Sequence, residues 1–480
     1  MGGSSLVPSL GTEQELTSMD IIAAISTGTN PTAIGIVRVS GEGCFALCDR
    51  VFRPSNGHLA SEQTPRKMVY GDMLDTEGRV IDRGLAVRFP GPHSYTGEDS
   101  AEFHCHGSPV VLRELLSALF AAGARQARAG EFTQRAFLNG QLDLTQAEAV
   151  IDLIDAETAA AARNAAAQLD GGLRRTLEPI QAALLEISSR FYAVVDYPDE
   201  DIEEIRPEQI TEALHTADEA LRRLLATCQR GKVLKSGVRT AIVGRPNAGK
   251  SSLLNALAGY DRAIVTDIPG TTRDTVEESV LCGGVLLRLI DTAGIRDTTD
   301  IVEQMGVERS RAAMEQADLV LAVVDGSSPV TEEDMPFLLS AARREKWILV
   351  WSKADITADN AFLDVPLPLS MEYHTPSAVV QLSSVTGKGL DALENAIREL
   401  YPAGAPGESG ALLTDQRQEE AARRAADAVR RAADALSSSL TPDAVLTDVE
   451  EALDALGELT GRTAKEEIVS RIFERFCVGK

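Results

Sequence analysis

The pattern of apolar and polar positions divides the chain into stretches of different character. Residues 20–140 hold short β-rich runs, at 33–39, 84–89 and 100–104, and a helical run near 109–122. Strands mixed with a helix on this scale are typical of a small α+β domain.

The next stretch is helical. From residue 142 the chain is rich in alanine, and apolar side chains recur every three or four positions up to 169, which predicts one long helix. Gly171 and Gly172 should end this helix. A second helix is then expected to run to about 195, and a third to span roughly 207–230.

From residue 237 the pattern changes to apolar β-rich runs that alternate with helical segments. Such alternation is typical of a parallel, doubly wound sheet. The expected strands are 238–243, 285–290, 319–324, 347–351 and 379–382.

Beyond a linker rich in Pro, Gly and Ser at 402–410, alanine-rich helices are expected again, over 416–436, 442–459 and 465–476. Similar helical stretches on both sides suggest that an α/β domain is inserted into one helical domain. The fold class is therefore multidomain, α+β and α/β. The expected parts are a flexible extension at 1–18, an N-terminal α+β domain at 19–140, a helical domain at 141–236 and 403–480, and an α/β domain at 237–402.

Charge and cysteine content narrow the function classes. The 480 residues carry a formal net charge of −25, and none of the parts is net basic. Because phosphate binding needs concentrated Lys and Arg, we do not expect this chain to hold a nucleic acid by itself. The sequence contains no run of about 18 apolar residues, so we do not expect a membrane span. Six cysteines without a signal peptide favour reduced thiols and a cytoplasmic location.

Two cysteine-containing patterns have a functional and a structural interpretation. His104, Cys105 and His106 could include metal ligands, but on a strand the two histidines share one face and the cysteine points away. Cys44 and Cys48 could face each other on a helix. For both cases we favour ordinary structural roles: no further ligand cluster lies near the two histidines, and Cys44 and Cys48 are expected to be small buried residues.

The strongest motif lies at residues 244–251. Its sequence, GRPNAGKS, fits G-x-x-x-x-G-K-[ST] in full, follows an expected strand and opens an expected helix. Backbone N–H groups of such a loop hold phosphate oxygens. We expect Lys250 to reach the β- and γ-phosphates and the Ser251 hydroxyl to bind Mg²⁺.

Four later motifs indicate the nucleotide. Asp291 begins D-T-A-G at a strand end, where a carboxylate supports the Mg²⁺ shell, and residues 270–274 offer a switch threonine that would complete Mg²⁺ coordination. Residues 352–355, SKAD, resemble the guanine motif N-K-x-D, in which the aspartate accepts from two guanine N–H groups. Ser352 replaces the asparagine, so we expect weaker binding of the same base. Residues 383–385, SSV, loosely match the S-A-K motif of GTPases.

The position after D-T-A-G is Ile295, where small Ras-like GTPases carry a glutamine that orients the attacking water. Isoleucine has no polar atom, so another group must orient the water. Glu303 lies downstream in the expected switch region. Its alternative interpretation is a solvated carboxylate on a helix.

Taken together, the chain resembles the MnmE (TrmE) family of tRNA-modification GTPases from about residue 20 to 480. The resemblance rests on the nucleotide motifs and on several short segments outside them. These segments are GIVRVSG at 35–41, FPGP at 89–92, YTGED at 95–99, GEF at 130–132, RAFLN at 135–139, LDLTQAEA at 142–149 and FCVGK at 476–480.

For the nucleotide site, the resemblance implies GTP hydrolysis with Mg²⁺ held by Ser251 and Thr272. K⁺ would be held by Asn247, Thr266, Ile268 and Thr271, in place of an arginine finger, and Glu303 would orient the water. The full set of residues expected to contact GTP is Asn247, Ala248, Gly249, Lys250, Ser251, Ser252, Thr266, Asp267, Ile268, Pro269, Gly270, Thr271, Thr272, Asp291, Thr292, Ala293, Gly294, Ser352, Lys353, Ala354, Asp355, Ser383, Ser384 and Val385.

The resemblance also implies that the N-terminal domain forms a homodimer and binds a reduced folate, 5-formyl- or 5,10-methylene-tetrahydrofolate. An ordinary ion pair between strands is the alternative interpretation of Arg38 and Glu102. Gln141 stands where the family usually has lysine. The positions that match the family's folate site are Arg38, Glu102, Arg135, Asn139, Gln141 and Lys480.

Cys477 matches the family's functional cysteine, and the alternative is a tail cysteine without a chemical role. The implied function is GTP hydrolysis in a complex with an FAD-binding partner of the MnmG (GidA) type. That complex would add a carboxymethylaminomethyl or aminomethyl group at C5 of wobble uridine 34, with tRNA held mainly by the partner. The alternatives are a stand-alone ribosome-assembly GTPase and a folate-dependent aminomethyl transferase that does not need GTP.

Overall fold

The structure is a computed structural model that describes residues 20–28, 30–196, 206–260, 278–290, 314–357, 373–402, 410–438 and 442–479. The chain forms two compact units. Unit 1 combines Met1–Ile151 with Gly457–Lys480, and unit 2 is Asp152–Leu456. Within the described residues, no helix has both the length and the apolar character that a membrane span requires.

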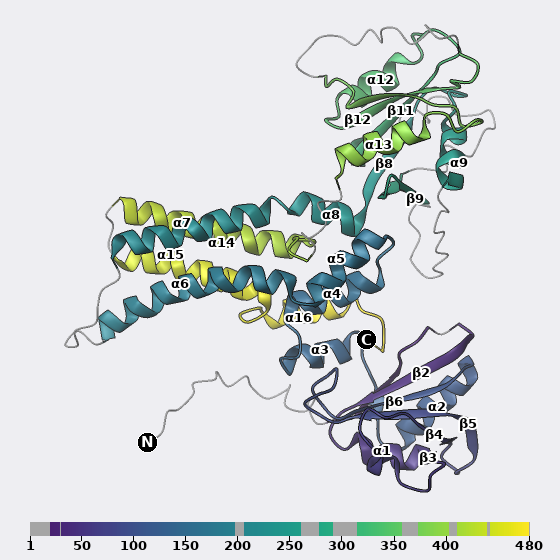
Figure 1. Ribbon diagram of the computed structural model, residues 1–480, viewed down its shortest axis with the longest axis vertical. Coiled ribbons are helices and arrows are strands. Elements are labelled where there is room, and N and C mark those ends of the chain that lie inside the picture. The colour runs from purple at the N-terminus through teal and green to yellow at the C-terminus, as the bar shows by residue number, and fades with distance from the viewer. Residues whose placement is uncertain are drawn as a thin grey trace. The chain divides into compact units, whose positions relative to one another are not determined.

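Unit 1 is built on a seven-stranded sheet, which Figure 1 draws in purple and blue. All pairs are antiparallel except β1 with β7. The strand order is β3-β4-β5-β6-β2-β1-β7. In chain order the strands are β1 (Ile22–Ile25), β2 (Thr32–Ser40), β3 (Phe52–Pro54), β4 (Val69–Leu74), β5 (Val80–Phe89), β6 (Ser100–Gly107) and β7 (Arg125–Gln126).

One face of this sheet is the core of unit 1. Val37 of β2 and Phe103 of β6 point to that face, where Leu115 and Leu119 of α2 (Pro109–Ala121) cover them. Because side chains alternate along a strand, Arg38 and Glu102 project from the opposite face. Unit 1 also contains α1 (Cys44–Val51), the 3-10 turn η1 (Ala60–Glu62), α3 (Glu131–Leu138), most of α4 (Leu144–Ile154) and α16 (Glu466–Phe473).

Unit 2 has a helical part in which helices from before and after the α/β part pack together. Helices α7 and α14 lie side by side in Figure 1, although their first residues, Pro207 and Gln416, are about 210 positions apart in sequence. Apolar residues of α7 recur three or four positions apart and are buried, which is the helical pattern of one packed face. The helices are α5 (Ala159–Leu169), α6 (Gly172–Asp196), α7 (Pro207–Leu225), α8 (Cys228–Ser236), α14 (Gln416–Ser437) and α15 (Pro442–Thr460).

The α/β part of unit 2 has a six-stranded sheet in the order β13-β12-β11-β8-β10-β9. Every pair is parallel except β9 with β10. The elements are β8 (Val238–Val243), α9 (Lys250–Tyr260), β9 (Glu278–Cys282), β10 (Val285–Leu289), β11 (Leu319–Asp325), α12 (Met335–Ala342), β12 (Trp347–Ser352), β13 (Ala378–Gln381) and α13 (Leu390–Leu400).

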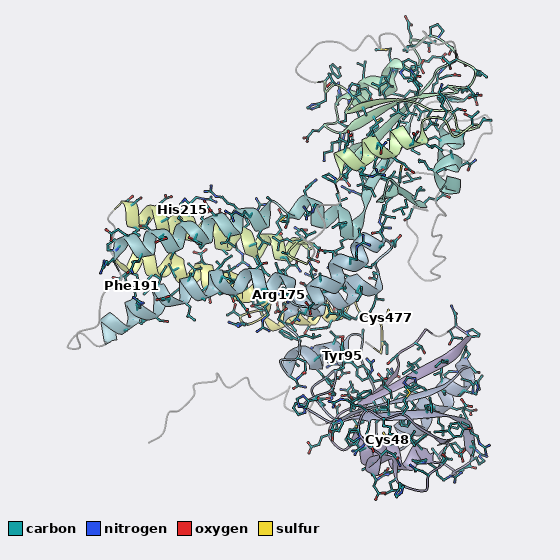
Figure 2. The ribbon with its side chains drawn as sticks, viewed as in Figure 1. Cys48, Tyr95, Arg175, Phe191, His215 and Cys477 are labelled. Carbon is teal, nitrogen blue, oxygen red and sulfur yellow. The ribbon has the colours of Figure 1, made fainter. Side chains whose placement is uncertain are left out.

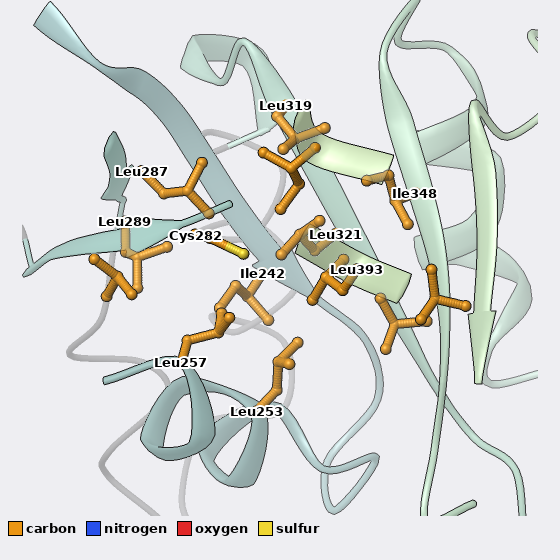
Figure 3. Close-up of a cluster of buried hydrophobic side chains, with 14 of the residues drawn as sticks. Ile242, Leu253, Leu257, Cys282, Leu287, Leu289, Leu319, Leu321, Ile348 and Leu393 are labelled. Atoms are coloured by element: carbon orange, nitrogen blue, oxygen red, sulfur yellow. The ribbon is translucent and has the colours of Figure 1, made fainter. Parts of the chain in front are cut away.

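Apolar clusters cover both faces of this sheet, as a doubly wound fold requires. Figure 3 shows the cluster in which Leu253 of α9 and Leu393 of α13 pack with Leu321 of β11. Leu338 of α12 packs with Trp347 in the second cluster. The fold class expected from the sequence is therefore confirmed.

Four details of the expected secondary structure were wrong. The helix expected from residue 142 is two helices, because Thr158 caps a new start: its Oγ1 accepts from the Ala161 N–H at 3.0 Å. The helix expected over 207–230 divides into α7 and α8, and the terminal helix ends at Phe473. The antiparallel strand β9 was not expected.

Candidate functional site

The phosphate loop (residues 244–251) joins β8 to α9 at the carboxyl end of the sheet, where open α/β sheets bind ligands. Its shape depends on glycine at two points. Gly244 has φ 152°, and a Cβ there would lie 2.2 Å from the Val323 carbonyl oxygen; Gly249 has φ 100°. Asn247 also adopts a left-handed conformation, with φ 61°, which asparagine tolerates better than most residues.

Lys250 is held by the loop it belongs to. Its Nζ donates to the Gly244 and Arg245 carbonyl oxygens, each at 2.8 Å. Burial lowers the pKa of Lys250. Two fixed hydrogen bonds keep the ammonium at the mouth of the loop, where it can pair with phosphate oxygens. Ser251 is the second residue of α9, so its hydroxyl lies at the start of a helix that follows a phosphate-binding turn.

The base loop (residues 352–355) begins where β12 ends. The Ser352 hydroxyl is buried and donates to the Ala248 carbonyl oxygen of the phosphate loop at 2.5 Å. Asp355 is exposed. The Ala354 N–H donates to the Leu382 carbonyl oxygen at 3.1 Å, which joins the base loop to the turn that holds residues 383–385. The structure thus brings three of the predicted nucleotide motifs to one edge of the sheet.

The turn at residues 383–385 presents two very different side chains. Ser383 is fully buried, and its Oγ accepts from the Thr386 N–H at 3.2 Å. Val385 is 86 % exposed. Ser383 therefore shapes the turn.

Several predicted site residues lie outside the described residues. They are Thr266, Asp267, Ile268, Pro269, Gly270, Thr271, Thr272, Asp291, Thr292, Ala293, Gly294, Glu303 and Lys480. Of the proposed ion ligands, the structure therefore describes only Ser251 for Mg²⁺ and Asn247 for K⁺. Glu303 remains a prediction from the sequence.

A second candidate site lies on the open face of the unit 1 sheet. Arg38 and Glu102 are register partners on β2 and β6, and Arg38 Nε donates to Glu102 Oε1 at 2.9 Å. The guanidinium carbon lies 5.4 Å from the centre of the Tyr95 ring and 5.7 Å from that of Phe132. Phe132 is fully buried and packs beneath the guanidinium, whereas Tyr95 is exposed. The Tyr95 ring, the cation and the carboxylate together make a surface suited to a flat, polar ring. Neither Tyr95 nor Phe132 was expected individually from the sequence.

His104 extends this group. Its Nε2 lies 3.4 Å from Glu102 Oε2 and has no hydrogen-bond partner among the described residues. His106 contacts Asp82 instead, with Nδ1 2.9 Å from Oδ1, and Cys105 is buried in the core. Among the described residues, no cluster of three or more His, Cys, Asp or Glu side chains is arranged to hold a metal ion.

Arg135 lies in an ion-pair network behind this site. Its side chain is buried and pairs with Asp20 at 2.7 Å, with Glu98 at 3.2 Å and with Glu131 at 3.2 Å. Burial alone would raise the pKa of Glu131, but hydrogen bonds from Arg125 and from the Arg128 backbone lower it to about 2. The network joins α3 to Asp20, just before β1, and to the turn at residues 94–99.

Asn139 and Gln141 border the same turn. Asn139 Nδ2 donates to the Thr96 carbonyl oxygen at 2.7 Å. A Cβ on Gly97 would come within 2.9 Å of Asn139 Cβ and 3.3 Å of Gln141 Cγ. The turn carrying Tyr95 is therefore held from two sides, by Arg135 and by Asn139.

The terminal segment returns to the N-terminal sheet within unit 1. The Gly130 N–H donates to the Cys477 carbonyl oxygen at 3.4 Å, and the Ser26 hydroxyl donates to the Gly479 carbonyl oxygen at 3.1 Å. Cys477, labelled with Tyr95 in Figure 2, is the exposed cysteine, whereas the other five are buried. Burial raises the pKa of Cys48 to about 12, which makes that thiol inert.

Two family profiles match this chain. "GTP-binding protein TrmE N-terminus" matches residues 21–141, and "MnmE helical domain" matches residues 144–477. Among solved structures, the G domain of the FeoB iron transporter of T. maritima is 29 % identical and covers 34 % of this chain and 97 % of its own, with a TM-score of only 0.24.

Full-length relatives give the clearest comparison. The protein named tRNA modification GTPase MnmE of Chloroflexus aurantiacus is 44 % identical over 464 residues, which cover 96 % of this chain and 100 % of the relative. The protein of the same name from Alkaliphilus metalliredigens is 39 % identical over 463 residues, covering 96 % and 99 %. With two family profiles and such coverage, the chain belongs to the MnmE family of tRNA modification GTPases.

Proposed function

We propose that this chain is the GTP-hydrolysing subunit of a complex that adds a carboxymethylaminomethyl or aminomethyl group at C5 of wobble uridine 34 in tRNA. Membership of the family makes it a GTP hydrolase of tRNA modification. The observation that carries the nucleotide part is the phosphate loop, in which Lys250 is fixed by two backbone carbonyls beside the base loop.

The phosphate loop has donors that suit two cations. The Ser251 hydroxyl, with Thr272, would hold Mg²⁺, a hard cation that prefers oxygen ligands. Asn247 is exposed in the loop and carries an amide oxygen, and Asn247, Thr266, Ile268 and Thr271 would hold K⁺. A cation beside the β- and γ-phosphates offsets charge that develops during hydrolysis.

Glu303 is proposed to orient the attacking water. The D-T-A-G motif is followed by Ile295, which has no polar atom for this task. A carboxylate can accept a hydrogen bond from water and hold it in line with the γ-phosphate. Lys250 meanwhile binds the phosphates and keeps them aligned.

The open face of the unit 1 sheet is proposed to bind the reduced folate, 5-formyl- or 5,10-methylene-tetrahydrofolate, which supplies the one-carbon unit. A pterin ring carries adjacent N–H groups that can donate hydrogen bonds to a carboxylate such as Glu102, and its flat face can stack on the exposed Tyr95 ring. Arg135 and Asn139 would shape the site by fixing the turn at residues 94–99. Gln141 and Lys480 complete the proposed set.

The proposed assembly is a cytoplasmic homodimer that binds an FAD-containing partner of the MnmG (GidA) type. The net charge of −25 opposes binding of tRNA phosphates by this chain, so the partner would supply most of the tRNA-binding surface. The proposed domains remain those given by the sequence: 1–18, 19–140, 141–236 with 403–480, and 237–402. Cys477 is exposed and is proposed to take part in the modification chemistry.

Nucleoside analysis of tRNA from a deletion strain tests the proposal. We expect C5 modification of wobble uridine to disappear and to return with the wild-type gene. Genes for Lys250→Ala and Arg38→Ala should each fail to restore the modification, the first because GTP binding is lost and the second because folate binding is lost. An unchanged nucleoside pattern in the deletion strain would overturn the proposal and favour a role in ribosome assembly.

A further inference from the structure

Asp325 connects the two nucleotide loops without belonging to either motif. It is the last residue of β11 and the register partner of Ser352 on β12. Its side chain is buried, and one oxygen, Oδ2, accepts from Lys353 Nζ at 2.6 Å. The other, Oδ1, accepts from the Ser327 N–H at 3.0 Å and from the Ser327 hydroxyl at 2.6 Å.

Lys353 needs such an anchor because its backbone is in an unfavourable conformation. Its φ is 57°, in the left-handed region that lysine rarely adopts. Strained backbone persists where the surroundings fix it. The ion pair with Asp325 holds the side chain, and the Ser352 hydroxyl holds the preceding residue to Ala248.

The same segment also holds the phosphate loop. Arg245 donates from Nη2 to the Ser328 hydroxyl at 2.9 Å, and its Nε lies 3.1 Å from Asp334 Oδ1. Asp334 is buried and is itself fixed, because its Oδ2 accepts from the Thr331 N–H at 2.9 Å. Residues 325–334, between β11 and α12 in Figure 1, therefore connect the two loops, and we call them the bridging segment.

We propose that Asp325 is a positioning residue for nucleobase recognition, which fixes Lys353 and thereby the direction of Asp355, two residues further on. This role compensates for Ser352. Its hydroxyl already donates to the Ala248 carbonyl oxygen, and a serine can make fewer hydrogen bonds than the asparagine expected at this position. Asp325 would thus raise the affinity for guanine specifically, since Asp355 distinguishes guanine by its paired N–H groups. The inference rests on the proposed GTP site.

The test compares GDP with inosine diphosphate (IDP), which lacks the 2-amino group, using the full chain and isothermal titration. Asp325→Asn keeps the shape of the side chain and weakens the pair with Lys353. We expect the Kd for GDP to rise about tenfold and that for IDP about threefold, so the preference for GDP narrows. Asp318→Asn is the matched control, because Asp318 pairs with Arg239 next to the opposite end of β11.

A double-mutant cycle separates positioning from general support of the fold. Lys353→Met removes the ammonium but keeps most of the stem. If Asp325 acts through Lys353, the double variant should bind GDP no more weakly than the weaker single variant. Equal losses for GDP and IDP, additive effects in the cycle, or unchanged GDP binding in Asp325→Asn would overturn the inference. Failure of the wild-type chain to bind GDP would instead overturn the proposed GTP site.

Discussion

Arg38 and Glu102 are 64 residues apart in sequence and meet as register partners on β2 and β6, with Arg38 Nε 2.9 Å from Glu102 Oε1. Each side chain is about one-fifth exposed, so the pair is accessible. The guanidinium also lies over two aromatic rings. These aromatic contacts distinguish the Arg38–Glu102 pair from the other ion pairs of the same sheet.

Glu102→Gln should weaken binding of 5-formyltetrahydrofolate about tenfold or more, because the amide replaces a charged acceptor with a neutral one. The Kd measured by isothermal titration checks this. Asp72→Asn is a suitable control, since Asp72 pairs with Arg53 at 3.0 Å on β3 and β4 of the same sheet. Equal folate affinity in wild type and Glu102→Gln would assign the Arg38 pair a structural role only.

GTP hydrolysis by the wild-type chain should be faster in potassium than in sodium buffer, and Asn247→Gly should remove this difference. Glycine is the right replacement because it accepts the φ of 61° without strain and takes away the amide oxygen. Steady-state phosphate release in the two salts measures the effect. Equal wild-type rates in both salts would contradict the potassium site.

Glu303→Ala should reduce kcat by about 100-fold or more while the Kd for GTP changes little, because the residue is proposed to act on water. Single-turnover hydrolysis and nucleotide titration separate the two quantities. Glu315→Ala replaces an exposed carboxylate nearby in sequence and should leave both unchanged. If Glu303→Ala still hydrolysed GTP at the wild-type rate, a residue other than Glu303 would have to orient the attacking water.

Glu131 should make unit 1 more stable at neutral pH than in acid. Its pKa in the folded chain, about 2, lies below the ordinary value of 4.5, so its contribution is complete above pH 4.5 and is lost as the pH falls towards 2. We expect Glu131→Gln to lower the free energy of unfolding at pH 7 by about 2 kcal/mol, allowing for solvent screening. Hydrogen exchange of α3 measures it. The deficit should shrink in acid; a deficit independent of pH would show another cause.

Motifs with fixed spacing were predictable from the sequence, and pairings across long separations were not. The phosphate loop needs eight consecutive residues, so its position between β8 and α9 follows from local pattern alone. The register that sets Arg38 against Glu102 depends on a whole sheet. From the sequence, the pair could be proposed as a site only through the resemblance to a family.

Helix boundaries show the same division. A periodic apolar pattern runs through Thr158, which suggested one helix, yet the Thr158 hydroxyl caps a new one. An N-cap side chain of this kind contributes about 1 kcal/mol to helix stability, and the spacing of apolar residues gives no sign of it. The role of Asp325 could not be predicted from the sequence either, because it depends on the contact with Lys353, and only the folded sheet brings these two residues together.

The return of the terminal segment to unit 1 has a consequence for biosynthesis. The Ser26 hydroxyl is bonded to a carbonyl 453 residues later, and a Cβ on Gly479 would lie 2.2 Å from the Ile25 carbonyl oxygen. The N-terminal sheet is synthesised before the terminal segment, so the contacts at the end of β1 can form only after the intervening residues of the chain have been made. A translation pause or premature stop before residue 479 would therefore leave the N-terminal sheet without these contacts, although all of its own strands had been made.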